Sequence, residues 1–174
     1  MDYFLLKQDK RYSNTPSLKE VYKTIPYKNI NLLNEDKIED NNIIFVNADE
    51  DTEYLDILNT QIFLISEKLK KIIEKYDTNI IFKRVCLIDK ERKNQNIYYL
   101  PIFREFEVLH EKSEFNLNKT IVKKIVLDEK KIKNKKIFKI KESDKTLIVV
   151  RLDAAESILR RNYDGIYLER LNVE

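Results

Sequence analysis

The sequence predicts an α+β protein with a mixed β-sheet, in which two strand-helix-strand units flank a run of antiparallel strands. A short apolar run, a residue able to cap a helix and a helix with one apolar face occur twice, near residues 62–85 and 147–171. Between them, residues 97–140 hold several short apolar or alternating runs that are separated by turn residues, as successive strands are. Strands between two helical units favour α+β over a doubly wound fold.

The first unit begins with the apolar run Ile62–Ile65 and continues into a helix. Ser66 follows the run and provides a side-chain oxygen that can cap the helix. Apolar residues then recur at spacings of three and four, so one helix face is apolar: Leu69, Ile72, Ile73 and Tyr76. We expect the return strand over residues 80–88, with a bulge at residues 83–84.

The second unit repeats this order. Leu147–Val150 is the expected strand, and Asp153 is the expected cap, with Glu156 three residues later as in a capping box. Gly165 stands where a left-handed residue is expected after the helix, and the last strand begins at Ile166. The two strands of each unit are joined by about a dozen residues, so we expect them to run parallel with a right-handed connection.

The N-terminal third is predicted from three shorter patterns. Tyr3–Leu6 is an apolar run typical of a strand, and Ile43–Val46 is a continuous apolar run typical of a buried strand. Asp49–Leu58 has acidic residues first and apolar residues later, which predicts a short helix whose first turn suits the helix dipole.

Length and composition indicate one ordinary globular core. The 174 residues are 43% hydrophobic, which predicts a single domain over residues 1–174, with two subdomains, 1–118 and 119–174, as the alternative. Lys and Arg (33) nearly balance Asp and Glu (30), unlike a disordered chain. No apolar run approaches a signal-peptide core or a membrane span. We therefore expect a cytoplasmic protein without a membrane contact.

Several kinds of site are excluded by the residue counts. Gly165 is the only glycine, so no glycine-rich phosphate loop can form. Cys86 and His110 are each the only residue of their type, which excludes a disulfide and the usual zinc sites. Asp49, Asp51 and Glu53 alternate like calcium ligands, but the required glycine and distal glutamate are missing. We expect no metal and no cofactor.

One group of residues could support catalysis. Glu105 and Glu107 lie two residues apart in an expected strand, so both would project from one face, as an acid-base pair requires. His110 lies close by in the sequence. The alternative function is therefore a hydrolase or nuclease that uses these three residues. Solvent-facing glutamates and a surface histidine are the commoner explanation of the same pattern.

Charge is unevenly distributed along the chain. Residues 35–56 hold nine acidic residues against the single Lys37, whereas residues 119–145 hold eleven lysines against four acidic residues. The lysines allow a nucleic-acid-binding module as a further alternative, but arginines and stacking aromatics are scarce there. Lysine-rich strands also protect sheet edges from aggregation. The acidic residues predict a docking surface for a basic partner, formed by Asp49, Glu50, Asp51, Glu53 and Asp56.

Four segments in a fixed order resemble the bacterial immunity-protein family numbered eleven, or a sibling family, found beside polymorphic toxins: Leu64–Ile73, Asn96–Ile102, Val108–Phe115 and the closing stretch from Leu147 to Leu171. The chain departs from that pattern at His110 and at Arg151–Asp153. The resemblance implies no catalytic residues and no cofactor. It implies that the protein neutralises a cognate toxin by stoichiometric association inside the producing cell.

Overall fold

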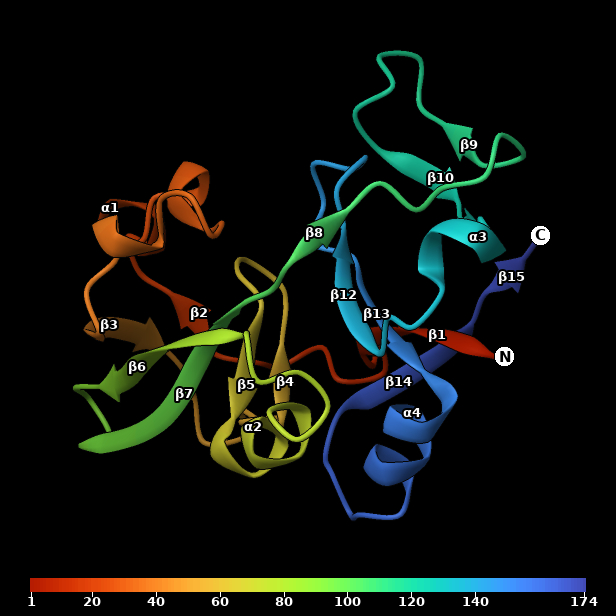
Figure 1. Ribbon diagram of the computed structural model, residues 1–174. Coiled ribbons are helices and arrows are strands. Elements are labelled where there is room, and N and C mark those ends of the chain that lie inside the picture. Colours follow the sequence, from red (N-terminus) through yellow and green to blue (C-terminus); the bar gives the residue numbers. More distant parts are fainter.

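The computed structural model describes all residues 1–174 as strands and short helices arranged around two sheets (Figure 1). The strands are β1 (Tyr3–Gln8), β2 (Ser17–Leu18), β3 (Asn41–Asn47), β4 (Ile57–Leu58), β5 (Leu64–Ser66), β6 (Ile81–Asp89), β7 (Asn94–Ile102), β8 (Glu105–Phe106), β9 (Glu114–Phe115), β10 (Val122–Lys124), β11 (Val126–Leu127), β12 (Ile137–Ile140), β13 (Ile148–Arg151), β14 (Ile166–Arg170) and β15 (Asn172–Val173). The α-helices are α1 (Val21–Thr24), α2 (Glu67–Ile73), α3 (Glu129–Ile132) and α4 (Leu152–Leu159), and 3-10 turns cover Tyr27–Asn29 and Glu35–Lys37.

The first sheet has six strands in the order β2-β3-β6-β7-β5-β4, and the second has five in the order β14-β1-β13-β12-β8. Two small pairs, β9 with β10 and β11 with β15, complete the fold. Both sheets combine antiparallel pairs with one parallel pair, β3 with β6 in the first and β8 with β12 in the second. The predicted α+β class with mixed sheets is confirmed.

Both strand-helix-strand units have the same topology, with one strand inserted between their two strands. In the first unit, β5 and β6 are each antiparallel to β7, which lies between them. In the second unit, β13 and β14 are each antiparallel to β1. The strands of each unit therefore run parallel, as predicted, although they are not neighbours in the sheet.

The two helices of these units begin differently. In α2 the Ser66 hydroxyl accepts from the Leu69 backbone N–H at 3.3 Å, which confirms the predicted cap. In α4 the residue at the cap position is Arg151, which makes no capping side-chain bond. The predicted cap at Asp153 is wrong, because β13 continues to Arg151 and the helix begins at the next residue. The Asp153 carboxylate instead lies 2.7 Å from the Arg151 guanidinium.

Two other local predictions are wrong. Residues 49–58 form no helix, because the Asp49 carboxylate accepts from the Asp51 backbone N–H at 2.9 Å and closes a local turn of the kind that competes with helix. The chain then enters β4, which pairs with β5. No bulge interrupts residues 83–84, because the register of β6 with β7 is continuous from Ile81 to Asp89.

The strands between the units do not form one sheet. Residues 97–100 lie in β7, which forms a hairpin with β6. Residues 103–109 contribute the short β8, which pairs with β12 in the second sheet, and a single bridge from Leu109 to Leu127. Residues 121–127 supply β10 and β11 to the two small pairs. The predicted strands exist, but long-range pairing divides them.

A shared core joins the two sheets. Leu69 and Ile73 of α2 pack with Ala155 and Ile158 of α4 in one buried cluster that includes residues of both sheets. The Tyr76 hydroxyl donates to the Asp153 carbonyl at 3.0 Å across this junction. Because of the shared core, we propose that the chain folds as one domain. β1 belongs to the second sheet, so the sheets do not divide at residues 118–119.

Candidate functional site

Four of the five predicted contact residues are exposed. Asp49, Glu50, Asp51 and Glu53 lie in the turn that follows β3. The Asn14 amide donates to the Asp49 carboxylate at 2.9 Å and, with Thr52, lowers the pKa of that carboxyl below its ordinary value. This acidic turn is therefore a charged surface that hydrogen bonds within the turn and from the loop before β2 hold in a defined conformation.

The fifth residue, Asp56, has a structural role. It is only 6% exposed, and its carboxylate accepts from the Asp164 backbone N–H at 2.7 Å and from the Ser66 hydroxyl. Asp56 therefore ties the cap of α2 to the turn that precedes β14. Because both carboxylate oxygens are used inside the protein, Asp56 is not part of the exposed acidic surface that was expected.

The three candidate catalytic residues do not form one cluster. Glu105 pairs with Lys139 at 2.6 Å, and Glu107 pairs with Lys141 at 3.0 Å. The Lys141 ammonium lowers the pKa of Glu107 below its ordinary value, which favours the ionised form over a proton donor. The His110 ring nitrogen Nδ1 accepts from the backbone N–H of Lys112 at 3.3 Å. None of the three side chains hydrogen-bonds another, and each is engaged with a different partner.

Many lysines of residues 119–145 are engaged within the protein. Besides the pairs with Glu105 and Glu107, Lys124 lies 3.4 Å from Glu114. The Lys131 ammonium donates to the Leu109 carbonyl at 2.9 Å, and the Lys135 ammonium lies 4.7 Å above the Phe106 ring. Lys123 and Lys145 line an open groove that residues of β1, β10 and β14 border. These contacts explain several lysines without a nucleic acid.

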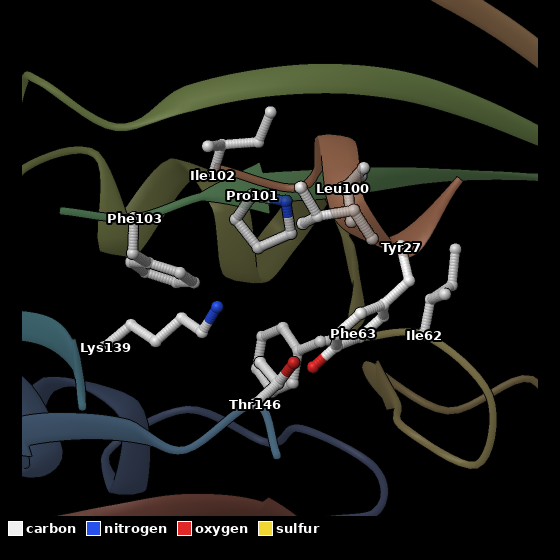
Figure 2. Close-up of a pocket in the computed structure, with 10 residues that line it drawn as sticks. Tyr27, Ile62, Phe63, Leu100, Pro101, Ile102, Phe103, Lys139 and Thr146 are labelled. Carbon is white, nitrogen blue, oxygen red and sulfur yellow. The ribbon is translucent and has the colours of Figure 1, made fainter. Parts of the chain in front are cut away.

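The close-up in Figure 2 shows a mostly apolar cavity at the junction of the sheets. The Lys139 side chain extends between Phe103 and Thr146, and the Phe63 ring lies beside Thr146. Its volume is about 20 Å³, and a cavity of this size has room for about one water molecule. The cavity is therefore too small for a substrate. Its one charged group, the Lys139 ammonium, is already paired with Glu105.

An exposed apolar surface on β3 was not predicted from the sequence. β3 was expected to be wholly buried, but its residues alternate: Ile44 and Val46 are buried, while Ile43 is 58% and Phe45 is 37% exposed. The prediction is wrong because this sheet packs against apolar residues on only one face at β3. A continuous apolar run carries no signal of which face lacks a covering layer.

No group of three or more His, Cys, Asp or Glu side chains is placed to hold a metal ion. No helix has the length and apolar character needed to cross a bilayer.

Comparison with protein-family models places this fold in the class of immunity proteins. The match is to the Immunity protein family (Imm11) and spans residues 6–172. Because it covers nearly the whole chain, the protein belongs to this family, and the predicted resemblance is confirmed. A comparison with curated proteins found no match.

Proposed function

We propose that the protein neutralises a cognate bacterial toxin by binding it, one molecule to one molecule, in the cytoplasm of the cell that makes the toxin. The family match over residues 6–172 carries this proposal. The separate engagement of Glu105, Glu107 and His110 supports occlusion of the toxin rather than catalysis. Surface complementarity then provides the mechanism.

The acidic turn is our proposed electrostatic contact. Asp49, Glu50, Asp51 and Glu53 are exposed, and the Asp49 carboxyl is held ionised by its neighbours. Carboxylates grouped on a surface attract a cationic partner over about one Debye length, roughly 8–10 Å at physiological salt, and raise the association rate. The turn therefore steers a basic region of the toxin toward the first sheet.

The test uses the toxin encoded beside this protein's gene. Both are co-expressed, the growth of the cells is followed, and the purified species is analysed by light scattering. The proposal predicts rescue of growth and a complex with the mass of one copy of each. Absence of both the complex and the rescue would contradict it.

The contribution of the acidic turn is tested by its rate effect. Replacing Asp49, Glu50, Asp51 and Glu53 by the corresponding amides should slow association by about tenfold at low salt and less at high salt. The control replaces the exposed Glu111 and Glu156 by glutamine, and its association rate should stay close to that of the wild type. If both variants slow association equally, the acidic turn is not part of the contact.

A further inference from the structure

The two faces of the first sheet are covered unequally. α1 contacts β3 on one face, and α2 contacts β5 and β7 (Figure 1). The Lys70 ammonium of α2 lies 4.9 Å from the Phe82 ring and 5.2 Å from the Tyr99 ring. These two aromatic residues mark the region of the sheet that α2 covers. Toward β3, the same face is left to solvent.

The uncovered region is a contiguous apolar surface. In the register of β3, β6 and β7, Ile43 lies opposite Cys86, Cys86 lies opposite Ile97, and Phe45 lies opposite Ile88. Opposed side chains of neighbouring strands are about 4.5–5.5 Å apart and touch. We call these five residues the outer face. Their immediate neighbours on the strands, such as Ile44, Val85 and Leu87, are buried on the other side.

The charged side chains that project from the strands of the outer face have one sign. Glu20 lines the groove at the edge of β3 beside Ile43 and Phe45, but its carboxylate is paired with Lys23. Among the alternating residues that project from this side of β3, β6 and β7, none is acidic, and Arg84 is exposed beside Cys86. The Lys90 ammonium, at the tip of the β6–β7 hairpin, lies 4.0 Å above the Phe45 ring. Neither cation has a carboxylate in reach, so both are available to a partner.

We infer that the outer face binds the toxin. The matching surface of the toxin is an apolar patch that is bordered by carboxylates. An apolar centre with a polar margin is the usual anatomy of a protein–protein interface, and a contiguous exposed apolar patch marks such a contact. This inference rests on the proposed function and names the surface and the partner chemistry. Nucleic acid is a poor match for the outer face, because its charged backbone does not complement an apolar centre.

A second copy of the chain fits less well than an acidic partner. In a two-fold dimer the same surface patch is used by both copies. Arg84 and Lys90 of both copies would then border one contact with no carboxylate of this face to oppose them, and like charges at an interface suppress association. The acidic turn, which follows β3, lies outside the outer face and is free to contact cations elsewhere on the same toxin.

The experiment measures affinity for the toxin encoded beside this protein's gene by titration calorimetry. Ile43→Asp places a carboxylate in the apolar centre and should weaken binding by more than tenfold. Leu159→Asp is the matched control, because Leu159 is an apolar residue of α4 that is 70% exposed, and binding should change by less than twofold. The reversals Arg84→Glu and Lys90→Glu should each weaken binding by about three- to tenfold, less at high salt. Circular dichroism melting checks that each variant is folded.

The outcomes separate the two proposals. If the wild type forms the complex and Ile43→Asp binds equally well, the outer face is not the contact, although the proposed function stands. If the wild type forms no complex, the proposed function fails and the inference fails with it. If the protein alone dimerises in sedimentation and Ile43→Asp abolishes the dimer, a second copy occupies the outer face and the assignment to an acidic partner is overturned.

Discussion

Strands β3 and β13 begin from the same kind of sequence and end in different surroundings. A four-residue apolar run underlies each strand: Ile43–Val46 lies within β3, and Leu147–Val150 begins one residue before β13. In β13, the residues Ile148, Val149 and Val150 are all 0% exposed. In β3 every second residue faces solvent.

The difference comes from the number of covering layers. Ile148 and Val150 belong to the core shared with α2 and α4, whereas Val149 faces a second core beneath α3. In β3 only the face with Ile44 and Val46 joins a core. In a strand that is covered on both faces, all the apolar side chains are buried and contribute to stability. A strand covered on one face retains apolar surface that stability does not use, and this surface is available for binding.

The largest expected effect separates the two strands directly. Ile148→Ala should lower the free energy of unfolding by about 3 kcal/mol, because it leaves a cavity in a closed core. Ile43→Ala, the same change at an exposed position, should cost less than about 1 kcal/mol. Urea denaturation of both variants measures the difference. Similar losses would show that β3 is buried as β13 is.

The second prediction tests the junction that makes both sheets one unit. Tyr76→Phe removes the hydroxyl that donates to the Asp153 carbonyl between α2 and α4 and should cost about 1–2 kcal/mol, because a half-buried acceptor loses its donor. Tyr167→Phe, at an exposed tyrosine, is the control and should be neutral. A single urea transition is expected for the wild type, and two transitions would mean that the sheets unfold separately.

The third prediction concerns pH. Burial raises the pKa of Asp77, but donors from Asn79 and Arg104 outweigh it, and the pKa of this carboxyl lies below its ordinary value. Since the folded-state pKa is below the unfolded-state pKa, the stabilisation is present above about pH 4 and is lost as the pH falls through the folded-state pKa. Arg104 is partly exposed, which limits the contribution of the pair.

Asp77→Asn should therefore cost about 1 kcal/mol at pH 7 and less at pH 3. Thermal melting of variant and wild type across this pH range measures the convergence. A constant difference across the range would show that the charge of Asp77 contributes nothing to stability.

The smallest expected effect lies at the outer face. Lys90→Gln removes the ammonium above the Phe45 ring, and an exposed cation–π contact contributes about 0.5–1 kcal/mol. Urea denaturation should show a loss at the lower end of this range, with Lys93→Gln, at an exposed lysine of the same hairpin tip, as a neutral control. A loss above about 2 kcal/mol would mean that the outer face already serves stability.

The features predicted correctly from the sequence are those that local chemistry determines. Ser66 caps α2 because its hydroxyl reaches the first turn, and Leu69 and Ile73 are buried because their spacing places them on one helix face. Gly165 adopts φ +72°, and a Cβ there would lie 2.5 Å from Leu55 Cδ1, so both backbone and space require glycine.

The features that were missed depend on contacts distant in the sequence. Asp56 looked like the end of an acidic surface, but its partner Asp164 lies 108 positions later. The exposure of Ile43 depends on how far α2 covers the sheet. The residues next to Ile43 in the sequence do not predict this extent. The residues available for binding were therefore harder to predict than the residues that build the helices.

The central claim is that β3, which is covered on one face, is a binding surface, whereas β13, which is covered on both faces, belongs to the core. Hydrogen exchange in the complex tests this claim most directly. Backbone amides of β13 should be slow to exchange in the free protein, and toxin binding should leave them unchanged. Amides of residues 41–53 and 84–97 should slow markedly when the toxin encoded beside the gene is bound. Protection confined to residues 119–145, with residues 41–53 unchanged, would contradict the account.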